Sequence, residues 1–434
     1  MNQEITKELL SFLAASPTSY HAVDTVSQEL LGKGFEQLSE GMPWNLEAGK
    51  SYFVTRNRSS LIAFKIPKEK YVGFQMVMSH ADSPAFKLKE IAEQKSGEKY
   101  LQLDTERYGG PIYSTWLDRP LKIAGRVLVQ MGDQIETRLV QLDDAVLIPS
   151  LAIHMNRDAN NGYTFNPQTD LLPLCGDGNA KGFLLQSISR KLRVSEEQIL
   201  GKDLYVICDT PAMIWGPHEE YYSSSRIDNL GCAFTTLKGF EAGHSESVSV
   251  YALFDNEETG SATKQGAAST FLSDVLRRIH VGMGRTEDEF YACMAASFLV
   301  SADNAHAVHP NHPEKADPFN RPYMNEGIVV KQTASSSYAT DGASAAVFRT
   351  ICKRAGVPVQ SFANRSDMPG GSTMGCCITG QVAVNTVDIG LPQLVMHSCY
   401  ETAGTQDAEW MVKAITEFYN TTIQMKADGT FQLR

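Results

Sequence analysis

The segment VGFQMVMSHADSPAF, residues 72–86, constrains the fold of this chain more than any other feature. Its first part is a nearly continuous apolar run, which is typical of a central strand in a parallel sheet covered on both faces. The run ends abruptly at two polar residues, His80 and Asp82. Because open α/β sheets bind ligands at the carboxyl ends of their strands, both residues are candidates for a functional site. A single histidine after a strand is, however, more often structural.

The order of the predicted elements indicates an α/β fold with an insertion. Residues 1–86 predict a helix, a pair of short strands and the strand that ends at His80. From residue 87 to 215, short β-rich segments separated by turn clusters predict an inserted β domain. From residue 216 to 434, strands and helices alternate again, which predicts a mostly parallel, helix-covered sheet. We therefore expect one α/β domain in two parts, interrupted by a β-rich domain.

The composition excludes several classes of protein. The 434 residues are 42% hydrophobic and 21% charged, which is typical of a soluble protein with more than one domain. A formal net charge of −11 without a basic stripe argues against a nucleic-acid partner. We find no signal peptide and no apolar segment long enough to span a membrane. The eight cysteines are scattered without a CxxC pair, so we expect reduced thiols and a cytoplasmic protein.

Further polar residues follow other predicted elements. They are Asp228 in SSSRIDNLG, Glu257 and Glu258 in VSVYALFDNEETG, Asp303 in FLVSADNAHAVHPNH, and His397 in LPQLVMHSCYE. Each cluster alone has a simple structural explanation, since acidic residues commonly cap helices or face water. Only their combination favours a functional interpretation.

Together these residues supply the ligands that a pair of divalent cations requires. Histidine nitrogens and carboxylate oxygens bind Zn²⁺, and Co²⁺ or Mn²⁺ accept the same set. One carboxylate has to bridge the two ions, and one acid has to stay free as a base. The adjacent Glu257 and Glu258 fit this requirement, because one can point to a metal and the other to the attacking water. Asp82 can hold His80 in its ligating tautomer.

The quoted motifs carry a family resemblance. HADSP, GGPIYSTWLDRPL, SSSRIDN, DNEETGS, DNAHAVHPNHP and LPQLVMHSCYE, in this order and spacing, resemble the M18 family of metalloaminopeptidases, the aspartyl aminopeptidases. The similarity runs from SPTSYHAV near the N-terminus to the final helices. It implies a catalytic domain split by a β dimerisation domain, a dinuclear metal site and a tetrahedral dodecamer built from dimers. It also implies removal of N-terminal residues, preferably Asp or Glu, from peptides.

The resemblance also implies a role for each site residue. His80 and Asp303 are similar to the ligands of one metal, Glu258 and His397 to those of the other, Asp228 to the bridge, Glu257 to the general base and Asp82 to the orienting acid. A cis peptide bond is implied between Asp228 and Asn229. The expected chemistry is attack of a metal-bridging water on a peptide carbonyl, with Glu257 taking its proton and passing it to the leaving amine.

Three further residues are candidates for contacts with substrate. Lys331, in GIVVKQTASSSYATD, could bind an acidic side chain, although a solvated surface lysine is the alternative. His306 is a second candidate for substrate binding. His154, in IPSLAIHMNRDAN, resembles the family's histidine that enters the active site of a neighbouring subunit. From its residues alone, this segment is also typical of an edge strand with an exposed polar end.

Other motifs have weaker functional interpretations. GGSTMG around Ser372 misses the G-x-S-x-G elbow, so we expect a loop near the site. GDGNAKG, residues 176–182, lacks a GK[ST] ending and a predicted preceding strand, which favours a surface turn. His309 and His312 lie in a proline-flanked loop, and His21 fits a helix start. Two other functions stay open: a related dinuclear peptidase or deacylase for neutral peptides or N-acyl amino acids, and a catalytically silent assembly subunit or peptide-binding scaffold.

Overall fold

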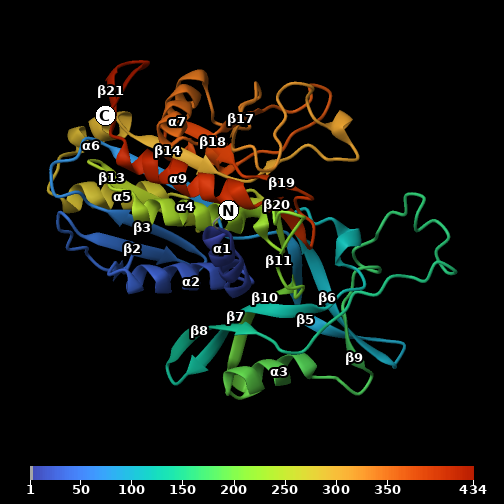
Figure 1. Ribbon diagram of the computed structural model, residues 1–434. Coiled ribbons are helices and arrows are strands. Elements are labelled where there is room, and N and C mark those ends of the chain that lie inside the picture. The colour runs from blue at the N-terminus through green and yellow to red at the C-terminus, as the bar shows by residue number, and fades with distance from the viewer. Residues whose placement is uncertain (1–2) are drawn as a thin grey trace.

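The structure is a computed structural model that describes residues 3–434, and its principal element is a nine-stranded sheet (Figure 1). In spatial order the strands are β1 (Glu36–Leu38), β2 (Ser51–Arg56), β3 (Ser60–Lys65), β13 (Val248–Phe254), β4 (Phe74–His80), β14 (Phe298–Ala302), β18 (Asn385–Gly390), β16 (Ile328–Lys331) and β17 (Val359–Phe362). The four central strands, β13 to β18, run parallel. β3 and β16 pair antiparallel with their central neighbours. The prediction of a mostly parallel sheet is confirmed.

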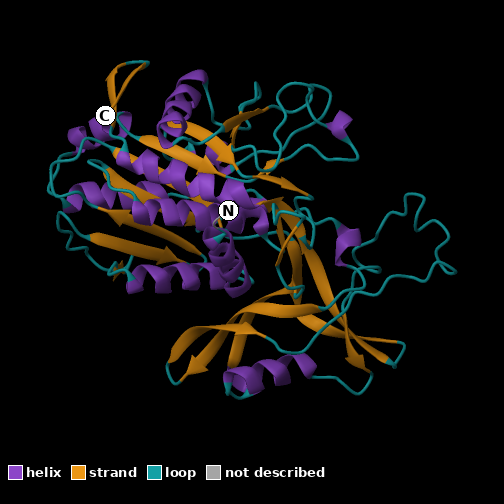
Figure 2. Cartoon of the chain, viewed as in Figure 1, coloured by secondary structure: helices purple, strands orange, loops and turns teal. Residues whose placement is uncertain are grey.

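Helices cover both faces of this sheet (Figure 2). One face packs against α1 (Glu4–Ala15), α2 (Ser19–Gly32), α4 (Ile227–Ala242), α7 (Gly342–Ala355) and α9 (Thr405–Asn420). The other packs against α5 (Phe271–Gly282), α6 (Glu287–Ala295) and α8 (Met374–Ile378). Within β4, Val77 enters the first core while Met76 and Met78 enter the second. Burial on both sides explains the continuous apolar run that the sequence shows there.

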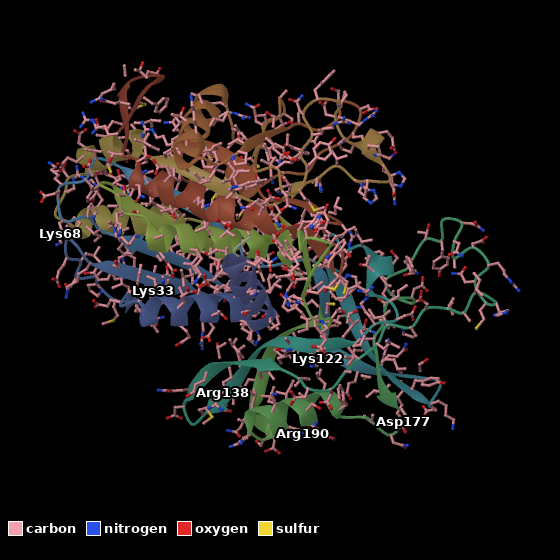
Figure 3. The ribbon with its side chains drawn as sticks, viewed as in Figure 1. Lys33, Lys68, Lys122, Arg138, Asp177 and Arg190 are labelled. Atoms are coloured by element: carbon pink, nitrogen blue, oxygen red, sulfur yellow. The ribbon has the colours of Figure 1, made fainter. Side chains whose placement is uncertain are left out.

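The inserted segment forms its own β-sheet, as predicted, and the strands of this sheet pair antiparallel. Its strands, in spatial order, are β8 (Gln134–Gln141), β7 (Leu121–Met131), β10 (Ile199–Cys208), β5 (Ala85–Ser96), β6 (Tyr100–Tyr108) and β9 (Leu174–Asp177). A separate apolar core joins this sheet to α3 (Phe183–Leu192), a helix that the sequence reasoning did not predict. Figure 3 labels Arg138, Arg190 and Asp177 on this insert, well away from Lys68 in the loop that follows β3.

A small third sheet connects segments that surround the carboxyl edge of the large sheet. It contains β11 (Met213–Trp215), β12 (Tyr221–Ser224), β20 (Glu401–Gly404), β19 (Pro392–Leu394) and β15 (Ala305–His306). The remaining elements are the hairpin of β21 (Ile423–Ala427) and β22 (Thr430–Leu433) and the 3₁₀ turns η1 (Tyr113–Trp116), η2 (Glu196–Gln198), η3 (Glu257–Thr259) and η4 (Pro313–Lys315). Because β15, β19 and β12 adjoin Asp303, His397 and Asp228 in the chain, this sheet holds three site residues in place.

Two expectations from sequence are wrong. A strand, β9, does lead into GDGNAKG, and α3 follows it. The Glu93 carboxylate accepts the backbone N–H groups of Gly182 and Leu184 at 2.7 Å each, so an internal anion already occupies the start of α3, where a phosphate would otherwise bind. The edge strand considered for the His154 segment is also absent, because residues 149–173 form a loop without a strand.

Two further observations concern the whole described chain. All eight cysteines are free thiols in residues 3–434. Over the same residues, no helix combines the length and the apolar character that are needed to cross a membrane.

Candidate metal centre

The ends of three parallel strands bring the predicted site residues to one edge of the large sheet. β4 ends at His80, and its parallel neighbour β13 ends at Phe254, which pairs with His80 in register. The chain after β13 turns into η3 and presents Glu257 and Glu258 at this edge. β14 lies on the other side of β4 and is followed directly by Asp303. Strand order and direction therefore determine this convergence, as the strand-end argument predicted.

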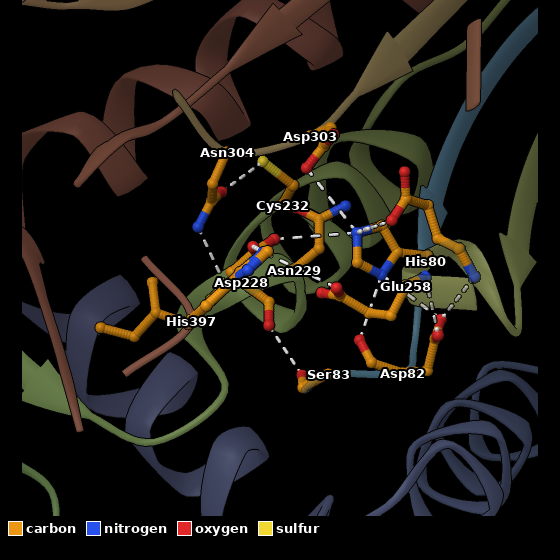
Figure 4. A network of polar contacts seen from close by, with 12 residues as sticks. His80, Asp82, Ser83, Asp228, Asn229, Cys232, Glu258, Asp303, Asn304 and His397 are labelled. Carbon is orange, nitrogen blue, oxygen red and sulfur yellow. Dashed lines mark hydrogen bonds and ion pairs between the residues drawn. The ribbon is translucent and has the colours of Figure 1, made fainter. Parts of the chain in front are cut away.

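The carboxylate of Asp228 lies between two imidazoles (Figure 4). Its Oδ1 atom is 3.7 Å from Nε2 of His80, and its Oδ2 atom is 3.3 Å from Nε2 of His397. On the first side, Oδ1 of Asp303 is also 3.7 Å from His80 Nε2. On the second side, Oε2 of Glu258 is 3.6 Å from His397 Nε2. Two ligand groups thus share Asp228.

Each of these two groups has its possible ligand atoms within 4.8 Å of one another. The first contains His80, Asp228 and Asp303, and the second contains Asp228, Glu258 and His397. The family resemblance implied these two groups, and a third possible group at the same edge contains His80, Glu257 and Glu258. The implied cis peptide bond between Asp228 and Asn229 is also present.

Both histidines have one ring nitrogen engaged away from the cluster. His80 Nδ1 lies 3.1 Å from the backbone oxygen of Asp82, and His397 Nδ1 lies 3.1 Å from the backbone oxygen of Gly110. A ring N–H donated to a carbonyl leaves the other nitrogen, Nε2, as a lone-pair donor. Gly110 belongs to the GGPIYST motif, so the insert contributes directly to the orientation of His397.

The unsatisfied charges and oxygens of the cluster fit divalent cations. Asp228 Oδ1 and Glu258 Oε1 are buried and have no hydrogen-bond partner within residues 3–434, which is unusual for buried polar atoms. Burial, reinforced by Asp228, raises the pKa of Glu258 well above its usual value. Burial opposes protonation of His397, but Asp228 and Glu258 outweigh it and raise the pKa of His397 to about 10. Neighbouring carboxylates contribute to both shifts in pKa, and bound cations would offset their negative charge.

Asp82 organises the turn that carries the two glutamates. Its carboxylate accepts the backbone N–H groups of Glu257 at 3.1 Å and Glu258 at 3.2 Å, and the hydroxyl of Tyr108 at 2.7 Å. Its Oδ1 atom also lies 3.4 Å from Nδ1 of His80. Asp82 therefore links the strand-end histidine to both acids, in addition to the orienting function that the sequence suggested.

Glu401 is an important residue that sequence reasoning missed. Its buried carboxylate accepts the backbone N–H of Asp228 at 3.0 Å and that of His397 at 2.8 Å. One side chain thus holds the backbones of two cluster residues at a defined spacing. Glu401 lies within the quoted LPQLVMHSCYE motif, but its contact with Asp228 spans 173 positions, which no local pattern indicates.

Lys331 is buried, so the alternative of a solvated surface lysine is wrong. It ends β16, and its Nζ atom lies 3.6 Å from Oδ2 of Asp303 and 5.6 Å from the centre of the Tyr338 ring. Burial acts to lower the pKa of Lys331, but Asp303 outweighs it, so the ammonium group stays charged. His306 lies three residues beyond Asp303 at the end of β15, where it remains exposed.

The other histidines lie outside the cluster. His154 is exposed in the loop of residues 149–173, which extends away from the insert on the right of Figure 1. Within residues 3–434, no metal-ligand group includes it. His309 and His312 also lie in an exposed loop, with ring centres 5.3 Å apart, and His312 contacts Glu314. Ser372 lies in the loop before α8, and His21 belongs to α2.

The helix-covered mixed β-sheet carries two groups of histidine and carboxylate ligands at one edge, and the two groups share the carboxylate of Asp228. This arrangement defines a candidate dinuclear centre of the kind used by metal-dependent hydrolases. Comparison with known proteins gives the family. Residues 12–419 match the family model described as aminopeptidase I zinc metalloprotease (M18). The chain belongs to the M18 family and is an aminopeptidase of the metallopeptidase class.

Related sequences and structures agree with this assignment. A probable M18 family aminopeptidase 2 of Clostridium acetobutylicum is 44% identical over 96% of this chain and 99% of its own length. Aspartyl aminopeptidase 1 of Schizosaccharomyces pombe is 39% identical over 95% and 94%. The cryo-EM structure of the Ape4 and Nbr1 complex superposes with a TM-score of 0.92 at 37% identity, over 96% of this chain and 85% of that one. The S. cerevisiae mApe1 dodecamer gives a TM-score of 0.85 at 26% identity, over 96% of this chain and 96% of that one.

Proposed function

We propose that this protein removes N-terminal residues from peptides with a preference for Asp and Glu, using two divalent metal ions, Zn²⁺ in the first instance. The observation that carries the proposal is the position of the Asp228 carboxylate between Nε2 of His80 and Nε2 of His397. His80 and Asp303 would hold one ion, Glu258 and His397 the other, and Asp228 both. The metal ions, when bound, supply Lewis-acid polarisation of the peptide carbonyl and acidify water.

Glu257 is proposed as the base. Its Oε2 atom lies 4.0 Å from His80 Nε2, at the side of the cluster, and its backbone is held by Asp82. Burial raises the pKa of Glu257 to about 7, despite the opposing effect of His80. A group in this range can take a proton from water and return it to the leaving amine near neutral pH.

A stripping and re-addition experiment tests the function. Protein treated with a chelator and reloaded with Zn²⁺, Co²⁺ or Mn²⁺ should hydrolyse aspartyl and glutamyl substrates faster than leucyl ones and leave acetyl-amino acids intact. Preference for a leucyl or acetylated substrate would favour the related peptidase or deacylase. No hydrolysis with any metal would favour the silent scaffold.

Acidic specificity is assigned to Lys331, because it is a buried cation beside the cluster. Lys331→Met should reduce kcat/KM for aspartyl substrates at least ~10-fold more than for leucyl substrates, since hydrogen bonds to charged groups contribute more than neutral ones. Because the change also leaves Asp303 without its cation, the ratio of the two substrates is the measurement. Lys65→Met is the control, because this half-buried lysine bonds to carbonyls of Phe240 and Gly243 far from the site. Equal losses for both substrates would assign a structural role to Lys331.

We further propose that residues 1–86 and 216–434 form the catalytic domain, and that the insert, residues 87–215, is a dimerisation domain. The dimers would assemble into a tetrahedral dodecamer in the cytoplasm. The exposed loop that carries His154 supports this, because Leu151, Ile153 and Met155 are 51%, 44% and 75% exposed. Apolar side chains in such a row are typical of a surface that another chain covers. The free cysteines fit a reducing compartment.

A complementation experiment tests whether His154 acts in a neighbouring subunit. His154→Ala and Glu257→Gln should each be inactive alone, and mixed oligomers of the two should recover activity. In a mixed pair, the His154→Ala chain keeps its base while its neighbour supplies an intact histidine. An oligomer proven to be hybrid by mass spectrometry that stays inactive would contradict donation between subunits.

A further inference from the structure

A cavity of about 370 Å³ adjoins the candidate metal centre. Three segments line it, residues 306–322, 362–371 and 393–396, and we call this cavity the basic pocket. Two of these segments lead straight into the cluster, because His306 follows Asp303 by three residues and Met396 directly precedes His397. Two of the three segments that line the basic pocket are therefore continuous in the chain with residues of the candidate metal centre.

The charged side chains that line the basic pocket are mostly cationic. They are Lys315, Arg321, Arg365 and Asp317. Asp317 already accepts the backbone N–H groups of Phe319 at 3.0 Å and Asn320 at 2.7 Å. The guanidinium of Arg365 is also engaged, by the carboxylate of Asp367 at 2.9 and 2.7 Å.

Two of these cations are not bound directly by a carboxylate, although Arg321 helps to lower the pKa of Asp317 and Lys315 that of Glu314. The side chains of Lys315 and Arg321 make no hydrogen bond or ion pair with any residue between 3 and 434. Both side chains line the cavity. The protein as a whole has a formal net charge of −11, so a pocket lined mainly by cations differs in sign from the rest of the molecule. An arginine with an unused fork of N–H donors is suited to a carboxylate, which it can bind through two parallel hydrogen bonds.

We propose that the basic pocket is a subsite for a carboxylate on the leaving side of the substrate, downstream of the scissile bond. This inference rests on the proposed function. In that function the acidic side chain before the bond is assigned to Lys331, which does not line the basic pocket. In the proposed function, the free amine of the substrate lies at the carboxylate cluster. The part of the peptide after the scissile bond therefore has to extend away from the cluster. The carboxylate comes either from the C-terminus of a short peptide or from an acidic residue soon after the bond.

The experiment uses the metal-loaded full chain and two pairs of peptides. Asp-Ala-Ala is compared with its C-terminal amide, and amidated Asp-Glu-Ala is compared with amidated Asp-Gln-Ala. In at least one pair, the wild-type kcat/KM should be roughly tenfold higher for the peptide with the carboxylate, and salt should reduce this ratio. A gain only in the first pair identifies the C-terminus as the source, and a gain only in the second identifies the side chain.

A double variant, Lys315→Gln with Arg321→Gln, tests the assignment to these residues. It should bring the ratio close to one while the amidated neutral peptide is cleaved at the wild-type rate. Lys426→Gln, which removes an exposed charge from the distant C-terminal hairpin, should leave the ratio unchanged. Equal rates within both pairs for the wild type, or a ratio that survives in the double variant, would overturn the subsite alone. Failure to cleave any of the four peptides would instead overturn the proposed function, and the subsite with it.

Discussion

Glu257→Gln is expected to keep both metal ions and to lose at least ~100-fold in kcat, which is the typical contribution of a positioned general base. Glutamine has almost the same size as glutamate, and the backbone N–H that bonds to Asp82 is unchanged. The variant therefore removes the proton acceptor with little change in geometry. Neither of the two ligand groups that share Asp228 requires Glu257, so metal content should persist.

The neighbouring residue provides the matched control for this prediction. Glu257 also falls in a third possible ligand group, with His80 and Glu258, which makes the distinction between base and ligand an experimental question. Glu258→Gln should lose the ion that His397 helps to hold, whereas Glu257→Gln should not. Elemental analysis of both variants, together with kcat under saturating metal, separates the two roles. Near-normal turnover in Glu257→Gln would exclude it as the base.

Asp228→Ala is expected to reduce the content of both metal ions, since its two oxygens face different imidazoles. His80→Ala should mainly affect one ion, because His80 belongs to only one of the two groups that share Asp228. The metal-to-protein ratio measured by elemental analysis after dialysis should therefore fall further in the first variant than in the second. His309→Ala is the control and should retain both ions, because this half-buried residue lies outside the cluster.

The thermal stability of the same variants provides a second measurement. Ions that bind the folded chain raise its stability by mass action, by about 2.7 kcal/mol when their concentration is 100 times Kd. A chelator should therefore lower Tm in the wild type and change it much less in Asp228→Ala. An unchanged metal content in Asp228→Ala would contradict the assignment of this residue as a shared ligand.

The sequence alone was sufficient for the architecture and for most of the cluster. Continuous apolar runs such as the one before His80 predict strands buried on both faces, and parallel strands place their carboxyl ends at one edge. His80, Glu257, Glu258 and Asp303 were found by this argument, because each follows a strand directly or within a short turn. The helix α3 was not predicted from the sequence, because its apolar positions lie among turn-rich segments that favour a purely β interpretation.

Contacts between distant segments could only be seen in the tertiary structure. Glu401 holds the backbones of Asp228 and His397, and Gly110 of the insert orients the His397 ring across 287 positions. Nothing in the neighbouring sequence of either residue indicates these partners, because hydrogen bonds depend on distance in space and periodicity reports only local structure.

The burial of Lys331 and its pairing with a carboxylate could not be predicted from the sequence either. A lysine is almost never fully buried without a partner, so sequence alone could not exclude a solvated side chain. Its burial follows from the position of β16 between β18 and β17 and from the carboxylate of Asp303 beside it. The sequence by itself therefore determined which elements form and which strand ends carry reactive groups, since both follow from local patterns of apolar and polar residues. The tertiary structure alone decided which charges pair, which are buried and which, like Arg321, form no ion pair, because those depend on the packing of segments far apart in the chain.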